Sequence, residues 1–353
     1  MSSARARPSL VDCDIHNELA PDSLTRYLPA RWRHYDETYG SRGDGGFAYP
    51  KGAPRAARTD AWPPSGLPPG ADLDFMRTQL LDPFDIRYGI LNCLAKSNRP
   101  NPDYAAALCR AVNDWQIDEW LEKEPRLRAG ITVPYEYPSL AAEEIDRSAG
   151  HPGFVQVLLL VRTDEPLGRR KYWPVFEAAV RHGLPIGIHF GGAGRNPLTA
   201  SGWPSFYIED HTLMAQAFQA QVVSLVVEGV FERFPGLRVV LIEGGFGWLP
   251  SLMWRLDAHW ARLRDEVPHL TRRPSEYIRE HFWVTTQPVE EPPDPKDLLT
   301  VFDHMGGTDR IMFSTDYPHW DFDHPDRAIR VRLDAETRER IMSGNATALY
   351  GLD

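Results

Sequence analysis

Short apolar runs bounded by turn residues recur along the whole chain. Eight of them have the length and composition of buried strands: residues 10–15, 86–92, 128–134, 154–161, 185–190, 237–243, 282–287 and 310–315. Several are apolar at successive positions, as in residues 239–242 (VVLI). Such runs are typical of parallel strands that are covered by helices on one face and packed together on the other.

Helical periodicity separates most of these runs. It is clearest over residues 104–121, 173–181, 213–234 and 249–263. Strands that alternate with helices pair in parallel, and eight is the number of strands that a (β/α)8 TIM barrel requires. We therefore expect an α/β fold with one TIM-barrel domain over residues 1–353. A doubly wound open sheet shows the same alternation, so the pattern alone does not exclude it.

Residues 17–80 interrupt this repeat after the first strand. They are rich in proline, glycine, arginine and aromatic residues. A loop at that place in a barrel lies over the face where the strands end and where barrel enzymes carry their chemistry. We expect the insertion to be a lid or a dimer contact, with an unstructured surface loop as the alternative.

Composition narrows the classes of partner. The chain has 39 Lys and Arg against 49 Asp and Glu, a net charge of −10 without a basic stripe, so nucleic acid is not an expected partner. Cys13, Cys93 and Cys109 lack a Cys-x-x-Cys spacing, which argues against a disulfide framework or a cysteine zinc site. Because no signal peptide and no apolar run of about 20 residues occurs, we expect a cytoplasmic protein without a membrane partner.

Ligand-type side chains end three of the expected strands. Asp14 and His16 end the first, His189 ends the fifth and Asp316 ends the eighth. Residues two apart share a face of a strand, the ends of parallel strands meet at one rim, and strands one and eight are neighbours in a closed barrel. Each residue alone has an ordinary structural explanation. Four at one rim favour a divalent metal site, since imidazole nitrogens and carboxylate oxygens are its usual ligands at hydrolytic centres.

A further carboxylate ends the sixth strand. Glu243 follows the apolar run 239–242, where an unpartnered charge is costly to bury. It is a candidate metal ligand, a candidate general acid or base with a shifted pKa, or the ion-pair partner of an arginine such as Arg195 or Arg255. We favour a functional role over a structural one.

At these positions the chain resembles the amidohydrolase-related superfamily. The resemblance covers almost the full length and rests on the Asp14-x-His16 pair and on residues 185–189 (PIGIH), 234–237 (FPGL) and 314–319 (STDYPH), of which the last block is the most specific. The branch that it resembles includes aminocarboxymuconate-semialdehyde decarboxylase and the nonoxidative decarboxylases of aromatic acids.

The resemblance implies a distorted (β/α)8 barrel of the metallo-dependent hydrolase type with one divalent metal ion, zinc or manganese. Asp14, His16, His189 and Asp316 would be its ligands, and Asp316 would also contact the attacking water. Members of the superfamily hydrolyse small cyclic or aromatic acids or remove carbon dioxide from them. Many are dimers, so the resemblance also implies a homodimer.

Two positions depart from that family. Asp14 stands where many relatives have histidine or glutamate, and it is a harder ligand that shifts the preference toward manganese or magnesium without excluding zinc. Glu243 stands where the decarboxylase relatives usually have a histidine that acts as acid or base. We therefore expect a metal-dependent hydrolase of a small, carboxylated cyclic or aromatic substrate. The alternatives are a nonoxidative decarboxylase and a metal-free ligand-binding barrel.

Other residues are expected near the same rim. His211 is a candidate acid or base, and His319 could support a metal ligand or bind the substrate. Arg195, Asn196 and Gln287 could hold a carboxylated substrate. Aromatic residues of these loops could enclose its ring, although loop aromatics often only pack the loop: Trp203, Phe206, Tyr207, Trp248 and Trp320.

The glycine-rich residues 244–250 (GGFGWLP) also follow a strand and precede a helix, as a dinucleotide-binding turn does. Pro250 replaces the third glycine of that fingerprint, and Trp248 would crowd a pyrophosphate near the backbone. The match is weak, and we do not expect a dinucleotide cofactor.

Overall fold

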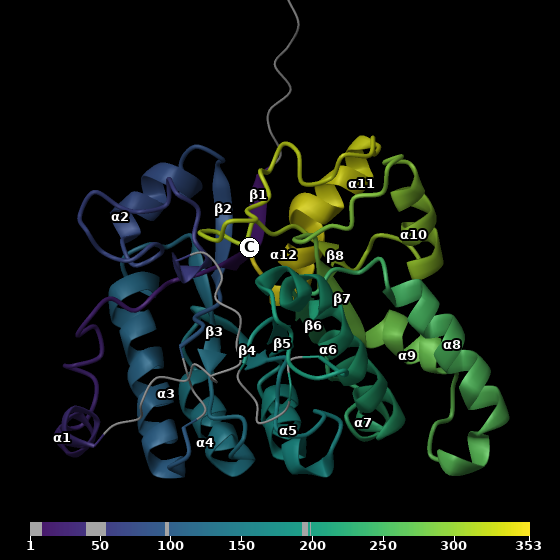
Figure 1. Ribbon diagram of the computed structural model, residues 1–353, viewed down its shortest axis with the longest axis horizontal. Coiled ribbons are helices and arrows are strands. Elements are labelled where there is room, and N and C mark those ends of the chain that lie inside the picture. Colours follow the sequence, from purple (N-terminus) through teal and green to yellow (C-terminus); the bar gives the residue numbers. More distant parts are fainter. Residues whose placement is uncertain (1–8, 40–53, 96–98, 193–196, 198) are drawn as a thin grey trace, which may run out of the picture.

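The computed structural model describes residues 9–39, 54–95, 99–192, 197 and 199–353. Eight parallel strands lie side by side in sequence order and form a nearly closed barrel, and helices surround it (Figure 1). The strands are β1 (Leu10–Ile15), β2 (Ile86–Leu91), β3 (Leu127–Thr132), β4 (Phe154–Leu160), β5 (Ile186–His189), β6 (Val239–Ile242), β7 (Phe282–Thr285) and β8 (Ile311–Met312). The sequential order confirms the barrel, because a doubly wound sheet changes direction along its strand order.

The helices fall into long and short elements. The longer ones are α1 (Ala30–Thr38), α3 (Pro102–Gln116), α4 (Pro138–Ser148), α5 (Trp173–Arg181), α6 (Tyr207–Val227), α8 (Leu249–Arg262), α9 (Pro274–His281) and α10 (Asp297–Met305). The short ones are α2 (Leu73–Met76), α7 (Val230–Arg233), α11 (Ala335–Glu339) and α12 (Asn345–Tyr350). Single 3-10 or π turns are η1 (Pro54–Ala56), η2 (Arg77–Leu81), η3 (Ile117–Leu121), η4 (Arg170–Tyr172), η5 (Arg264–Glu266) and η6 (Arg340–Gly344). The main hydrophobic core lies between these helices and the outer face of the sheet.

The helix expected over residues 213–234 differs from the observed one at both ends. It begins earlier, at Tyr207, where the Glu209 carboxylate accepts hydrogen bonds from the backbone N–H groups of Ser205 and Phe206, both 2.8 Å long. It breaks at Gly229, whose φ of 75° is a left-handed conformation that glycine adopts without strain. The earlier start matters for function, because it places the first turn of α6 at the rim of the barrel.

The closure of the barrel is irregular. The strand expected over residues 310–315 ends at Met312, and the backbone beyond it bonds to β1 at isolated points: Cys13 N–H donates to Phe313 O (2.9 Å) and Asp316 N–H donates to Asp14 O (3.0 Å). The buried Asp12 carboxylate accepts from the N–H (2.9 Å) and the hydroxyl (2.6 Å) of Thr315. A side chain thus replaces part of the strand pairing, which is why β8 is short. In Figure 1 the purple β1 accordingly lies beside the yellow C-terminal elements.

The floor of the barrel, at the amino ends of the strands, is filled by the C-terminal segment. Arg238, just before β6, donates to Leu349 O (2.9 Å), and Tyr350 is buried inside. The Tyr350 hydroxyl donates to Gln156 Oε1 (2.9 Å), and Gln156 Nε2 donates to Asn92 Oδ1 (2.8 Å). We call the surrounding apolar side chains the floor cluster: Val11, Cys13, Ile90, Val155, Leu158, Val240, Ile242, Met312, Ala346, Leu349, Tyr350 and Leu352.

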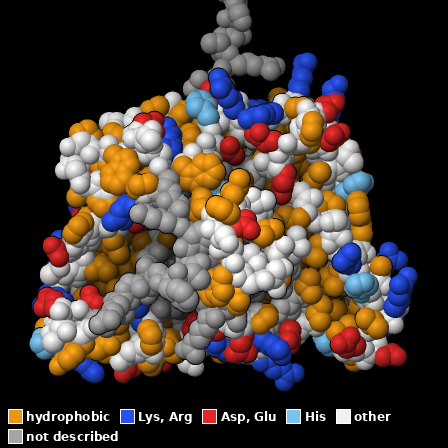
Figure 2. Space-filling model, in the orientation of Figure 1, with side chains coloured by type: hydrophobic (Ala, Val, Ile, Leu, Met, Phe, Trp, Pro, Cys, Tyr) orange, Lys and Arg blue, Asp and Glu red, His pale blue; other side chains and the backbone are white. Residues whose placement is uncertain are grey.

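The insertion over residues 17–80 is described except for residues 40–53. Its segment 54–58 lies against residues 318–320: Arg58 N–H donates to Pro318 O (3.0 Å) and Trp320 N–H donates to Ala56 O (2.7 Å). The insertion therefore reaches the mouth of the barrel, next to His319. On the face shown in Figure 2, basic and acidic side chains are interspersed. No helix within the described ranges has the length and apolar character to cross a membrane.

Candidate metal centre

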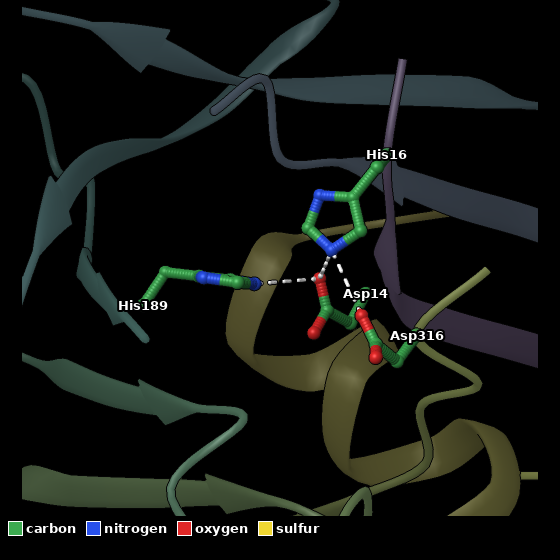
Figure 3. A group of neighbouring side chains, drawn as sticks. All are labelled: Asp14, His16, His189 and Asp316. Carbon is green, nitrogen blue, oxygen red and sulfur yellow. Dashed lines mark hydrogen bonds and ion pairs between the residues drawn. The ribbon is translucent and has the colours of Figure 1, made fainter. Parts of the chain in front are cut away.

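Four buried side chains meet at the mouth of the barrel (Figure 3). Asp14 lies on β1 with His16 just beyond it, His189 ends β5, and Asp316 follows β8. His16 Nε2 lies 2.9 Å from Asp316 Oδ1 and 3.5 Å from Asp14 Oδ1, and His189 Nε2 lies 3.2 Å from Asp14 Oδ1. One ligand atom from each of the four residues lies within 4.8 Å of the others. The structure thus brings together the four residues that the sequence predicts as metal ligands.

Backbone carbonyls orient both imidazoles. His16 Nδ1 donates to Asn92 O (2.7 Å) and His189 Nδ1 donates to Phe190 O (2.7 Å). Each ring therefore directs Nε2 toward the centre of the cluster, as expected when the distal nitrogen of a ligating histidine is fixed by a hydrogen bond. Asn92 also donates from Nδ2 to Asp14 Oδ1 (2.9 Å), so it braces two of the four residues.

Several buried oxygens at the centre lack a donor. Among the described residues, Asp14 Oδ2, Asp316 Oδ2 and Glu243 Oε2 have no hydrogen-bond partner. An unsatisfied carboxylate oxygen is costly to bury, and a bound cation removes that cost. Together with two inward-facing imidazoles, these oxygens form a donor set that fits a divalent metal ion.

Burial opposes ionisation of every group in the cluster. At Asp14, attraction to His189 and His16 outweighs burial and holds the pKa at about 2, and Asp14 in turn raises the pKa of His189 to about 9 against the effect of burial. Burial lowers the pKa of His16 to about 4. Burial and repulsion between carboxylates raise the pKa of Glu243 and of Asp316 well above the usual range. Without a cation, bound protons therefore neutralise part of the negative charge of the carboxylates in the cluster.

Two of the acidic residues have a strained backbone. Glu243 (φ 57°) and Asp316 (φ 60°) adopt the left-handed conformation, which is uncommon for residues other than glycine. In both cases the strand has just ended, so the turn directs the carboxyl group into the mouth. Strain of this kind concentrates at functional sites, where the surrounding structure holds it in place.

Glu243 links the four-residue cluster to two neighbouring groups. Its Oε2 lies 3.5 Å from His189 Nε2. It forms one set with Asp316 and His319 and another with His211 and Asp321, and in each set the ligand-type atoms lie within 4.8 Å of one another. The structure thus pairs Glu243 with a histidine. The alternative of an ion pair with Arg255 is not seen among the described residues, and Arg195 lies outside them.

The two histidine candidates lie on either side of this group. His319 Nδ1 is 2.6 Å from Asp316 Oδ1, and its ring centre is 4.3 Å from that of His16. His211, in the first turns of α6, pairs through Nε2 with Asp321 Oδ2 (3.1 Å). Both predicted positions therefore lie at the mouth of the barrel.

The candidate substrate residues are more dispersed. Gln287 is buried and donates from Nε2 to Asp321 Oδ2 (2.9 Å), and the Tyr207 hydroxyl accepts from Trp320 Nε1 (3.2 Å). Trp203 is 47% exposed. Trp248 is partly buried, packs against the main core and donates to Gly244 O (2.9 Å), and its place against a substrate stays a prediction. Arg195 and Asn196 lie outside the described residues.

Sequence reasoning missed three residues around the site. Asn92 ends an expected strand and braces Asp14 and His16. Arg162 follows another expected strand and forms a buried ion pair with Asp210. Asp321 joins His211 to Gln287. The strand-end rule applied to Asp14 and His189 would have found Asn92 and Arg162, whereas Asp321 lies in a loop without such a signal.

The fold and this cluster define a TIM-barrel enzyme with a candidate site for a divalent metal. A family model described as amidohydrolase matches residues 11–352, so the chain belongs to the amidohydrolase family. This confirms the resemblance drawn from the strand-end residues.

Similar proteins include several decarboxylases. The chain is 28% identical over 315 residues to gamma-resorcylate decarboxylase of Polaromonas sp. strain JS666, with 82% of this chain and 94% of the relative covered. It is 24% identical over 361 residues to 2-amino-3-carboxymuconate-6-semialdehyde decarboxylase of Dictyostelium discoideum, with 94% and 91% covered. The solved dihydroxybenzoic acid decarboxylase of Polaromonas sp. JS666, which holds manganese and the inhibitor 2-nitroresorcinol, aligns with a TM-score of 0.68 at 23% identity over 98% of this chain and 97% of that one. This structural likeness supports the fold.

Proposed function

We propose that this protein is a metal-dependent, nonoxidative decarboxylase of a small aromatic carboxylic acid. The observation that carries the proposal is the four-residue cluster with a further buried carboxyl group, that of Glu243, at its side. The decarboxylases similar to this chain over most of its length support the choice of reaction. These relatives favour nonoxidative decarboxylation, the alternative given by the sequence, over the hydrolysis expected from it.

Decarboxylation requires a group that polarises the substrate and a group that supplies a proton. The bond between a ring carbon and the carboxyl carbon breaks, its electron pair forms a new bond to a proton, and carbon dioxide leaves. Asp14, His16, His189 and Asp316 would hold the divalent ion, which when bound supplies the positive charge that orients and polarises a carboxylate or ring hydroxyl. The buried Glu243, whose pKa is raised, keeps a proton beside the cluster.

Three finer features belong to the same proposal. Manganese fits best, because Asp14 is a hard oxygen ligand and a related decarboxylase was solved with manganese. The insertion acts as a lid, because residues 54–58 lie beside residues 318–320 at the mouth. A homodimer stays a prediction, and light scattering of the purified protein tests it.

Hydrolysis is the second candidate function. A carboxylate at Glu243 can also accept a proton from water and return it to a leaving group. The amidohydrolase family assignment supports this reaction at the level of the family alone.

The test compares both reactions in one protein preparation. The protein is stripped with a chelator, reloaded with manganese or zinc, and incubated with ring-hydroxylated benzoates, including the 2,6-dihydroxybenzoate bound by a related enzyme, and with cyclic amides. We expect release of carbon dioxide and, in D2O, one deuterium on the carbon that carried the carboxyl group. Amide cleavage without carbon dioxide release would replace the proposal with the hydrolase.

The variant Glu243→Gln tests the role of the carboxyl group beside the cluster. We expect kcat to fall on the order of 10²-fold with metal content unchanged, which is the usual contribution of a general acid or base. Loss of the metal would instead make Glu243 a ligand. Glu291→Gln is the matched control, since Glu291 is an exposed residue that pairs with Arg330.

A further inference from the structure

The proposed decarboxylation consumes one proton in each turnover, and the cluster that would use it is closed to solvent. The side chains of Asp14, His16, His189 and Asp316 are fully buried, and that of Glu243 is 5% exposed. A group that borders both the cluster and the solvent is therefore placed to renew the proton. The inference rests on the proposed function, because hydrolysis needs no net proton.

His211 has the position for this task. Its side chain is 17% exposed, and it belongs to the set with Glu243 and Asp321 whose ligand-type atoms lie within 4.8 Å of one another. Its ring lies among the aromatic rings of Phe190, Tyr207 and Trp320, with centres 5.1 to 6.2 Å away. The imidazole therefore borders the buried acid on one side and the outer mouth on the other.

Asp321 fixes which nitrogen of His211 can exchange a proton. Asp321 Oδ2 lies 3.1 Å from His211 Nε2 and also accepts from Gln287 Nε2 (2.9 Å). With Nε2 committed to Asp321, Nδ1 is the nitrogen left to take up and release a proton. A carboxylate that orients a histidine in this way follows the general logic of acid–base catalysis.

A buried ion pair holds the helix that carries His211. Arg162, beyond the end of β4, pairs through Nη2 with Asp210, and both side chains are almost fully buried. The Arg162 guanidinium lies 4.9 Å from the centre of the Phe190 ring, and Phe190 O accepts from the Nδ1 of His189. The first turn of α6 is thus anchored to the same strand end that carries a predicted metal ligand.

We propose that His211 brings the consumed proton from solvent into the site, and that Asp321 and the Arg162–Asp210 pair are positioning residues that hold its imidazole there. His211 takes up a proton from the solvent and passes it to Glu243, and this proton replaces the one transferred to the ring carbon. Among the described residues, the charged and titratable groups that face His211 are Asp321, Glu243, Tyr207 and His319.

The test uses the metal-loaded enzyme and the variants His211→Ala and Asp321→Asn. We expect kcat to fall on the order of 10²-fold in His211→Ala and about tenfold in Asp321→Asn, with KM changed less than about threefold. The solvent isotope effect on kcat should rise in both variants, and added imidazole should restore at least part of the rate to His211→Ala alone. His182→Ala is the matched control, because His182 forms a similar pair with Asp146 (2.7 Å) at the end of α5.

Specific outcomes would overturn the inference. An unchanged kcat in His211→Ala, or a change in KM alone, would show that His211 lines the site without transferring a proton. Loss of one metal equivalent in both variants, with another retained, would make the set a second metal site.

The positioning role also has a test that needs no activity. In ¹⁵N NMR of the wild type, His211 should carry its proton on Nε2, and Asp321→Ala should abolish that preference; an unchanged spectrum contradicts the role of Asp321. If the wild type releases no carbon dioxide from any acid, the proposed function fails by itself, and this spectrum still decides whether Asp321 positions His211.

Discussion

The mouth and the floor of the barrel differ in whether their buried polar groups have hydrogen-bond partners. At the floor, the Tyr350 hydroxyl and the Gln156 amide are hydrogen-bonded within an apolar cluster. At the mouth, buried carboxylate oxygens of Asp14, Asp316 and Glu243 lack donors among the described residues. Buried polar groups that remain unsatisfied cost stability, so the chain retains them where a ligand can satisfy them. The comparison separates the end that stabilises the fold from the end that performs the chemistry.

The largest expected effect is the loss of activity in Asp316→Asn at the mouth. The change removes a ligand charge, and asparagine tolerates the left-handed backbone at φ 60°. We expect kcat/KM to fall by about 10⁴-fold. The free energy of unfolding of the metal-free protein should stay unchanged or rise, because burial of a carboxyl group with a raised pKa costs stability at neutral pH and asparagine removes that cost. Steady-state kinetics and urea unfolding measure the two quantities, and substantial activity in this variant would contradict the metal centre.

At the floor, Leu158→Ala should lower the stability of the protein and leave its activity nearly unchanged. Leu158 is buried in the floor cluster, and its truncation leaves a cavity inside the barrel. We expect the free energy of unfolding to fall by about 3 kcal/mol. Metal content and kcat/KM of the folded protein should change less than about twofold. A large loss of kcat/KM in the folded variant would show that the two ends are not separate.

Asn92 joins the two ends, so Asn92→Ala should affect both. It loses the contacts with Asp14 and leaves the Gln156 amide without its acceptor. We expect metal affinity to fall about 10- to 100-fold and the free energy of unfolding to fall by about 1–2 kcal/mol. Competition with a chelating dye and urea unfolding measure these changes. A change in stability without a change in metal affinity would show that Asn92 supports only the floor of the barrel.

The smallest effect concerns Glu124, which precedes β3 at the floor end. Hydrogen bonds from Arg126, opposed by burial and supported by Arg77, lower the pKa of this carboxyl from 4.5 to about 2. Because the folded-state pKa is depressed, its contribution is complete above about pH 4.5 and is lost as the pH falls toward 2. Glu124→Gln should therefore lower the free energy of unfolding by about 1 kcal/mol at neutral pH, with a shrinking difference in acid. Urea unfolding at several pH values tests this, and kcat/KM should not change.

The sequence predicted the barrel well because its signal is local. Each strand is an apolar run between turn residues, and eight such runs appear in the structure in the expected order. The four cluster residues were also predictable, because one rule, that polar residues at strand ends share a rim, applies to all of them. His211 was predicted as a candidate, although nothing local indicated that α6 begins at Tyr207.

The remaining features depend on contacts between distant segments. The strand expected over residues 310–315 is shorter because the Asp12 side chain binds Thr315, a contact between residues that are 303 positions apart. The pairing of Asp321 with His211 and Gln287 likewise joins helix α6 to two separate loops. The packing of Trp248 against the main core was not predictable, because an aromatic residue in a loop gives no sign of which way it faces. Periodicity carries no information on such contacts.

The hydrogen bonds from Tyr350 through Gln156 and Asn92 to Asp14 have a consequence for biosynthesis. His16 and Asp316, which meet at the site, are 300 positions apart in the chain. A nascent polypeptide on the ribosome cannot assemble the site until the segment carrying Asp316 and Tyr350 has been translated. An ion held by all four cluster residues can therefore bind only after almost the whole chain has been translated.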